Sequence, residues 1–219
     1  MSDKYGFIEK VARLKDSLKD YPNVKVVAAT KYMDIDQTRA LVEAGIKDIG
    51  ENRTDMFLEK YEALKDLDIN WHFLGTVQSR KVRDIVGKID CLHSLDKLAT
   101  AMELDSRLTE DLDCFIQVNV TDDPSKAGVN PAKVISFVKS LGKCKNIKIV
   151  GLMCIAKMTF EDDILEAEFK KLKKLQTEVE ALNLEYAPCH ELSMGMTNDY
   201  EIALKCGATV LRLGHIFLD

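Results

Sequence analysis

The sequence has no Cys-x-x-Cys pair, no apolar run long enough to cross a membrane and no excess of positive charge. Its six cysteines are scattered, which argues against a zinc site or a redox motif and favours buried thiols in a reducing compartment. The 36 acidic and 31 basic side chains give a net charge of -5, so we expect neither nucleic acid nor a membrane surface as a partner. The amino-terminal segment lacks the apolar core of a signal peptide. We therefore expect a cytoplasmic protein.

A Gly-x-Gly-x-x-Gly fingerprint is also missing after the first strand-like run, which argues against an open dinucleotide-binding sheet. Strand-like runs instead alternate with helical patterns along the whole chain, as in parallel α/β folds. Eight strands are expected at residues 24–31, 47–50, 70–74, 89–92, 114–120, 147–153, 190–193 and 209–213. Small or polar residues follow nearly every one of them. We therefore predict an α/β fold, a single (β/α)8 TIM-type barrel domain spanning residues 1–219, with an open doubly wound sheet as the alternative.

An amphipathic helical pattern over residues 5–19 precedes the first strand. Further helices are expected over residues 53–65, 97–108, 165–182 and 199–205, after Asp34 or Asp36, near Gln78 and after Pro131. The chain continues for too few residues beyond the eighth strand to form another helix. The extra amino-terminal helix is therefore predicted to fill that gap in the outer ring of the barrel.

The first strand-like run ends in a lysine. Val24, Val26 and Val27, with the two alanines that follow them, suit a strand buried on both faces, which places Lys31 at its carboxyl end. Ligand sites of α/β barrels gather at that end, and a partly desolvated lysine amine there is a nucleophile toward aldehydes. Lys31 is therefore a candidate Schiff-base lysine. The alternative is a solvated lysine that opens the next loop.

Two segments near the carboxyl terminus indicate an anion site. The hydroxyls of Ser193 and Thr197 flank the sequence Met-Gly-Met directly before a helical pattern, and backbone N–H groups at such a position bind phosphate. Arg212 and Gly214 end the next strand and add a guanidinium and a second glycine turn. A reactive lysine and a phosphate seat at one rim suggest pyridoxal 5'-phosphate, which carries both an aldehyde and a phosphate. Alternatively, the first glycine only closes a turn, Thr197 only caps a helix and Arg212 only pairs with an acid.

The second and third strands add further polar candidates. Glu51 and Asn52 follow the second strand at the level of the predicted site. In the third strand Trp71 and Phe73 alternate with His72, so the two aromatic residues are expected to pack on one face and His72 to lie on the other. His72 is then either a hydrogen-bonded core residue or part of the site.

Taken together, these motifs resemble those of the pyridoxal phosphate homeostasis proteins, whose fold is similar to the N-terminal barrel of alanine racemase. The motifs are AATK (28–31), GEN (50–52), WHFLG (71–75), QSRK (78–81), IQVN (116–119) with Ser125, Lys126 and Gly128, GLM (151–153), ELSMGM (191–196) and RLG (212–214). They cover nearly the whole chain. The resemblance implies that Lys31 holds pyridoxal 5'-phosphate as a Schiff base, that Ser193, Met196, Thr197 and Gly214 contact its phosphate, that Arg212 lies near its pyridine nitrogen, and that Asn52 and His72 line the ring pocket.

The carboxyl-terminal residues depart from the family pattern in two places. The family usually carries serine or threonine after the last glycine, where this chain has His215. His215 is expected to replace the missing hydroxyl contact through its backbone N–H or its ring. The family tail usually continues with glycine and arginine, whereas this chain ends in Leu218 and Asp219, so contacts from that tail are not carried over.

The expected function is binding of the cofactor for homeostasis, either storage or delivery to apo forms of pyridoxal phosphate enzymes, without robust turnover. Alanine racemase needs a second base from a second domain, which this chain lacks, and an arginine at the pyridine nitrogen makes the ring a poorer electron sink. Two alternatives are a pyridoxal phosphate enzyme with weak racemase-like activity on amino acids and a lyase that forms a Schiff base with a sugar phosphate. We expect a monomer, because racemases of related fold need the second domain to pair.

Overall fold

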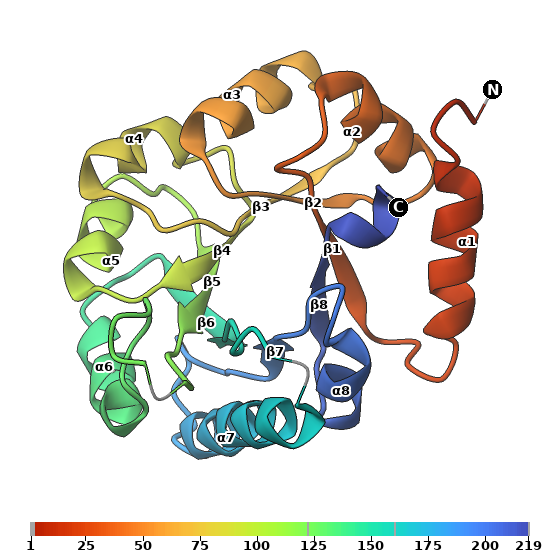
Figure 1. Ribbon diagram of the computed structural model, residues 1–219. Helices are drawn as coiled ribbons and strands as arrows, with labels where there is room; N and C mark the ends of the chain where they lie inside the picture. The colour runs from red at the N-terminus through yellow and green to blue at the C-terminus, as the bar shows by residue number, and fades with distance from the viewer. Residues whose placement is uncertain (1–2, 122, 160, 219) are drawn as a thin grey trace.

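Eight parallel strands close into a barrel in the computed structural model, which describes residues 3–121, 123–159 and 161–218 (Figure 1). Strands that are neighbours in sequence pair with each other, and β8 pairs with β1 to complete the ring. The strands are β1 (Lys25–Ala29), β2 (Asp48–Glu51), β3 (Asn70–Phe73), β4 (Cys91–Leu95), β5 (Leu112–Gln117), β6 (Ile147–Met153), β7 (Glu191–Ser193) and β8 (Val210–Leu213). The predicted α/β TIM-type barrel is confirmed.

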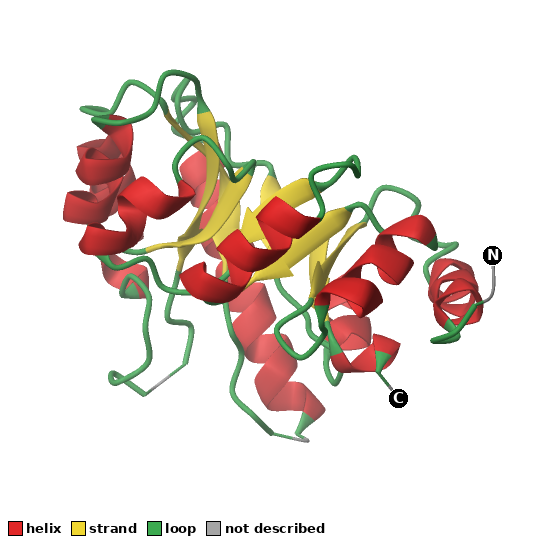
Figure 2. Ribbon diagram, turned by 90° about the horizontal axis from the view of Figure 1, so that it is seen from above, coloured by secondary structure: helices red, strands yellow, loops and turns green. Residues whose placement is uncertain are grey.

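The helices form a ring around the strands (Figures 1 and 2). They are α1 (Phe7–Ser17), α2 (Ile35–Glu43), α3 (Thr54–Ala63), α4 (Val82–Ile85), α5 (Leu98–Asp105), α6 (Val134–Leu141), α7 (Asp162–Glu180) and α8 (Tyr200–Lys205), with short 3-10 turns η1 (Ser79–Lys81), η2 (Pro131–Lys133) and η3 (His215–Phe217). Among the described residues, none of these helices has the length and apolar character needed to span a bilayer.

Helix α1 completes the outer ring beside η3. Figure 1 shows it in the outer ring between α2 and α8, and its buried face carries Phe7, Val11 and Leu14. The ammonium of Lys10 donates to the Phe217 carbonyl at 3.0 Å, which ties α1 to η3. Only η3 follows β8 within the described residues. The prediction of an extra amino-terminal helix is confirmed.

Alternation along β3 separates the two layers of the core. Trp71 and Phe73 point outward and meet Phe57 of α3 edge-on, with ring centroids 5.5 Å and 6.2 Å away. His72 lies between them in sequence and points into the barrel, as strand geometry requires. A small cluster of buried apolar residues lies inside the barrel beside His72, namely Val27, Leu74, Cys91, Phe115, Met153 and Val210.

The ends of α2 follow the signals in its sequence. The carboxylate of Asp34 accepts the Gln37 N–H at 2.7 Å, and the Gln37 side chain accepts the Asp34 N–H, so a capping box starts the helix. Gly45 follows the helix with a φ of +105°, a conformation that favours glycine. Of the two cap residues that the sequence offered, Asp34 and Asp36, the structure uses Asp34.

Several predicted boundaries were wrong. β4 runs over Cys91–Leu95, later than residues 89–92, and its five residues are all buried. β5 ends at Gln117, because the chain then bridges from Val118 to Val129 instead of continuing as a strand. The helix expected from Gln78 consists of η1 and the four residues of α4. The shift of β4 matters for function, because it moves His93 from a loop into the barrel.

All six cysteines are free and buried, as the sequence predicted. Burial raises the pKa of the thiols of Cys154 and Cys189 to about 12. Such thiols are protonated at neutral pH and unreactive in the folded state.

Candidate functional site

The carboxyl ends of β7, β8 and β1 bring the lysine and both glycine segments to one rim. The register pairs Ala28 of β1 with Leu213 of β8, so Gly214 follows beside the end of β1. A Cβ on Gly214 would lie 3.0 Å from the Ala29 carbonyl oxygen, which shows how closely the two segments approach. The Arg212 N–H donates to the Gly195 carbonyl at 2.9 Å and joins β8 to the loop after β7.

Lys31 lies two residues beyond β1 and is exposed. Its ammonium lies 4.5 Å from the centroid of the Tyr32 ring, within range of a cation–π contact. The Tyr32 ring lies in turn against His215, with centroids 5.3 Å apart. The expectation of a partly desolvated Lys31 was wrong for the protein alone, because the loop after β1 carries the amine out into solvent.

A buried ion pair supports the backbone just before Lys31. The Thr30 hydroxyl donates to the Glu51 carboxylate at 2.6 Å, and the Lys60 ammonium donates to that carboxylate and, at 2.7 Å, to the Thr30 carbonyl. The side chains of Glu51 and Lys60 are 0% and 3% exposed. Glu51 is therefore not a ligand-facing carboxylate. Together with Lys60, it holds Thr30 in place at the end of β1.

The loop after β7 forms the predicted glycine turn, but one of its backbone N–H groups already donates to a side chain of the protein. Gly195 has a φ of +93°, and a Cβ there would lie 2.8 Å from the Ala203 Cβ, so both the conformation and the packing require glycine. The Met196 N–H donates to the carboxylate of Asp199, whose pKa is raised by burial. Thr197 is half-buried and Met196 is exposed at this rim. The helix that follows is α8, of six residues, so its end is a smaller anion seat than the sequence suggested.

Arg212 is a buried cation whose hydrogen-bond partners among the described residues are both neutral. Its Nη1 donates to the Ser193 Oγ and its Nη2 to the Cys154 carbonyl, both at 2.7 Å. Burial lowers the pKa of the guanidinium from its usual value, although it stays protonated. Among the described side chains, no carboxylate forms an ion pair with it. The alternative that Arg212 only pairs with an acid was wrong.

Asn52 and His72, predicted to line one ring pocket, lie in different surroundings. Asn52 follows β2 and is exposed, and its carbonyl lies so close to Gly75 that a Cβ there would come within 1.9 Å. His72 is 4% exposed inside the barrel, where its Nδ1 meets His93 at 2.9 Å and its Nε2 meets Asp48 at 3.0 Å. Both ring nitrogens of His72 therefore already have partners within the protein.

A family model described as "Alanine racemase, N-terminal domain" matches residues 7–218 of this chain. The chain belongs to this family. A pyridoxal phosphate homeostasis protein of Aquifex aeolicus is 38% identical to it over 87% of this chain and 84% of its own length. The pyridoxal phosphate homeostasis protein of a Synechocystis strain is 39% identical over 89% of this chain and 90% of its own length.

Solved structures agree with this membership of the alanine racemase N-terminal domain family. PipY of Synechococcus elongatus, solved with pyridoxal phosphate bound, superposes with a TM-score of 0.89 at 31% identity and covers 97% of this chain and 100% of its own. An alanine racemase of Clostridium difficile superposes with a TM-score of 0.81 at 12% identity. It covers 97% of this chain but 56% of its own, and at that identity it shows the shared fold alone.

Four residues near the candidate site were not predicted from the sequence. Tyr32 and Asp199 lie in loops, where no periodic pattern predicts a side chain's direction. Lys60 falls among other charged residues of α3 and has no local signal of burial. His93 was detectable in principle, since it lies two residues after Cys91 and so on the same face of β4, but the strand was predicted to end before it.

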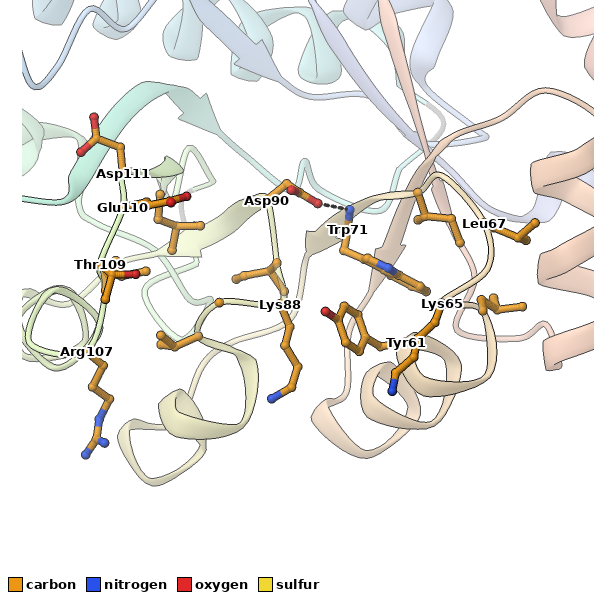
Figure 3. A pocket seen from close by; sticks show the side chains of 17 residues that line it. Tyr61, Lys65, Leu67, Trp71, Lys88, Asp90, Arg107, Thr109, Glu110 and Asp111 are labelled. Atoms are coloured by element: carbon orange, nitrogen blue, oxygen red, sulfur yellow. Dashed lines mark hydrogen bonds between the residues drawn. The ribbon is translucent and has the colours of Figure 1, made fainter.

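A separate pocket of about 660 Å³ lies at the amino ends of β3, β4 and β5 (Figure 3). Tyr61, Trp71, Lys88 and Arg107 line it, and the Trp71 N–H donates to the Asp90 carboxylate at 2.7 Å. Active sites of such barrels lie at the carboxyl ends of the strands. This pocket is at the opposite end from Lys31 and is not part of the candidate site.

Proposed function

We propose that this protein binds pyridoxal 5'-phosphate covalently and reversibly through Lys31, and that it stores or delivers this cofactor without robust turnover. The residues proposed to hold the cofactor are Lys31, Asn52, Ser193, Met196, Thr197, Arg212, Gly214 and His215. His72 stays a predicted pocket residue, although the partners of both its ring nitrogens favour an indirect role.

The observation that carries this proposal is the buried guanidinium of Arg212, which has only neutral partners at the rim that also carries Lys31. A buried charge without a counter-charge costs free energy, and a ligand with acceptor atoms or negative charge offsets that cost. Pyridoxal phosphate offers a ring nitrogen and a phosphate as acceptors.

The side chains at the rim fit a ligand of this kind. When bound, pyridoxal phosphate supplies an aldehyde that reacts with primary amines. The Lys31 amine attacks the aldehyde carbon, a carbon–nitrogen double bond replaces the carbonyl and water leaves. Because Lys31 is exposed beside Tyr32, both the ligand and water can reach it, so the same bond can be hydrolysed for release.

Binding without robust turnover is supported by two observations. Relatives more than 30% identical over most of this chain are named pyridoxal phosphate homeostasis proteins, and PipY has been solved with pyridoxal phosphate bound. A permanently charged guanidinium such as Arg212 also disfavours protonation of a neighbouring ring nitrogen, which weakens the ring as an electron sink.

We further propose that the recipients are apo forms of pyridoxal phosphate enzymes and that the protein acts as a cytoplasmic monomer. Six free, buried thiols suit a reducing compartment. Light scattering of the purified protein tests the monomer, and reactivation of an apo-enzyme by the loaded protein tests delivery.

The cofactor site is tested by absorption spectroscopy of the purified protein with added pyridoxal phosphate, before and after borohydride, followed by peptide mapping. We expect a visible band in the wild type, a reduced adduct on Lys31 and loss of both in Lys31→Ala. Lys47→Ala is the matched control, because Lys47 is an exposed lysine at the opposite end of the barrel. An adduct on another lysine would overturn the site.

The same preparations separate the alternatives. Sustained racemisation of an amino acid that disappears in Lys31→Ala would replace the binding function with an enzymatic one. A lyase acting on a sugar phosphate would give a colourless reducible adduct with its substrate and no visible band with pyridoxal phosphate.

A further inference from the structure

A chain of hydrogen bonds runs through the inside of the barrel from the proposed site to the opposite end. It joins Arg212 Nη1 to Ser193 Oγ (2.7 Å), Ser193 Oγ to His93 Nδ1 (2.9 Å), His93 Nε2 to His72 Nδ1 (2.9 Å) and His72 Nε2 to Asp48 Oδ1 (3.0 Å). These residues come from β8, β7, β4, β3 and β2. We call this chain the relay.

The chemistry of its two ends fixes the direction of every bond in the relay. Arg212 can only donate, and the ionised carboxylate of Asp48 can only accept, so His72 Nε2 carries a proton. Burial inside the barrel lowers the pKa of His93 well below its usual value, so His93 is neutral and holds one proton. That proton lies either on Nε2, from which it is donated to His72, or on Nδ1, from which it is donated to Ser193.

Only one placement of the His93 proton satisfies all groups. If His93 Nε2 donates to His72 Nδ1, then His93 Nδ1 accepts from the hydroxyl of Ser193, which itself accepts from Arg212. The opposite placement leaves the Ser193 hydroxyl hydrogen without an acceptor among the described hydrogen bonds and adds a charge to His72. The relay therefore donates in one direction, from Arg212 to Asp48.

This arrangement connects the buried cation to the only carboxylate along the relay. Each hydrogen bond in such a chain polarises the next, and the barrel interior around it is apolar, so the effect of Asp48 reaches the Ser193 oxygen that accepts from Arg212. The second acceptor, the Cys154 carbonyl, fixes the plane of the guanidinium. These two bonds use one N–H group of each terminal nitrogen of Arg212.

We propose that Asp48, His72 and His93 are positioning residues, which hold the Arg212 guanidinium in the orientation in which it meets bound pyridoxal phosphate, although none of the three contacts the ligand. This inference rests on the proposed function. Under this proposal, a change at the amino-terminal end of the barrel alters cofactor binding at the carboxyl end. Asp48 lies at the amino-terminal end beside Lys25, with 3.9 Å between their charged atoms.

The same interior groups could also suggest a metal site. The ligating atoms of His72, Cys91 and His93 lie within 4.8 Å of one another. However, the two facing ring nitrogens already share a proton, and burial raises the pKa of Cys91 well above its usual value, so this cysteine is a thiol and not the thiolate that binds zinc. The relay accounts for these contacts without an ion.

The first test needs no cofactor. Nitrogen-15 NMR of histidine-labelled protein reports the protonation of each ring nitrogen. We expect His72 and His93 both to be neutral with the proton on Nε2, and addition of pyridoxal phosphate to shift both of them more than the exposed His190. A proton on His93 Nδ1, shifts no larger than that of His190, or stoichiometric zinc in the purified protein would each overturn the relay.

The second test compares Asp48→Ala with Asp48→Asn and with Asp113→Ala, which removes an exposed acid at the same end of the barrel but outside the relay. We expect Asp48→Ala to weaken pyridoxal phosphate binding about five- to tenfold and to shift the absorption maximum of the bound cofactor. Asp48→Asn is expected to restore part of both, because its amide oxygen still accepts from His72 Nε2. Asp113→Ala is expected to behave like the wild type.

The outcomes distinguish the relay from the proposed function. If Asp48→Ala binds with the affinity and absorption maximum of Asp113→Ala, the relay does not position Arg212. A loss of stability without a change in the spectrum also overturns it, because a purely structural role would give that result. If the wild type binds no pyridoxal phosphate, the proposed function fails, and the ligand-free NMR pattern still shows whether the relay donates from Arg212 to Asp48.

Discussion

The His93 ring forms hydrogen bonds through both of its nitrogens and is stacked on Phe115 with centroids 4.5 Å apart. Charging such a ring would place a cation in an apolar layer beside Arg212. Burial is the largest cause that lowers the pKa of His93 well below its usual value, and the nearby charge of Arg212 acts in the same direction. The unfolded chain therefore binds a proton at a higher pH than the folded chain does.

This difference predicts a pH dependence of stability. The contribution of His93 is fully present above about pH 6.5, the ordinary pKa of histidine, and is lost progressively as the pH falls below it. Between pH 7.5 and 5.5 we expect the wild type to lose about 1 kcal/mol more free energy of unfolding than His93→Gln loses. Urea unfolding at the two pH values measures this, and His190→Gln, at an exposed histidine, is the control. Equal losses in the wild type and His93→Gln would contradict the assignment.

Single residues of the site were predictable where the strand rule applies. Lys31 and Arg212 were singled out as candidates because polar residues at the carboxyl ends of buried parallel strands meet at one rim. The rule could not give the direction of a loop side chain. It therefore missed the exposure of Lys31 and the carboxylate of Asp199, which occupies the Met196 N–H that was expected to be free for phosphate.

At the scale of elements, α1 is not part of the eightfold repeat, yet it covers apolar surface of the barrel. Phe7, Val11 and Leu14 follow the helical period and are buried, whereas Ile8 and most of the charged positions are exposed. This periodicity made the helix predictable. α4 was less predictable, because four residues are too few to show a period, and the boundary of β4 was hidden by His93 and Ser94, which look like loop residues but are buried in the strand.

We expect Leu14→Ala to lower the free energy of unfolding by about 3 kcal/mol, because Leu14 is 4% exposed and its truncation leaves a cavity under α1. Lys15→Ala, at the next position of the same helix, is the control and is expected to change stability by no more than about 0.5 kcal/mol. Urea unfolding of the two variants measures the difference. Similar losses would mean that α1 is only loosely attached to the barrel.

At the scale of the whole molecule, closure depends on how strands far apart in sequence align. Counting eight strand-like runs predicted the barrel, but nothing local in the sequence specifies that His72 lies opposite Cys91 or that the register shifts between β4 and β5. That alignment places His93 next to His72. The relay is therefore a property of the closed barrel, and sequence patterns alone could not predict it.

Because the closed barrel buries its cysteines, it also predicts the order in which their thiols react. Cys114, Cys154 and Cys189 are 0% exposed, whereas Cys144 and Cys206 are 7% and 9% exposed. Burial raises the pKa of all five thiols, so reaction with an aromatic disulfide reagent at pH 8 needs local or global opening. We expect Cys144 and Cys206 to react first, and the other three to react together at the rate of global unfolding.

Mass spectrometry of peptides from timed quenches measures the rate at each cysteine, and full denaturation gives the reference in which all six thiols react. The three fully buried cysteines lie in or near β5, β6 and β7, which are consecutive strands of the ring. Each of these strands is paired on both sides, so none can leave the barrel without breaking two ladders. If one of the three thiols reacted much faster than the protein unfolds, its strand would be opening by itself, and the barrel would not unfold as one cooperative unit.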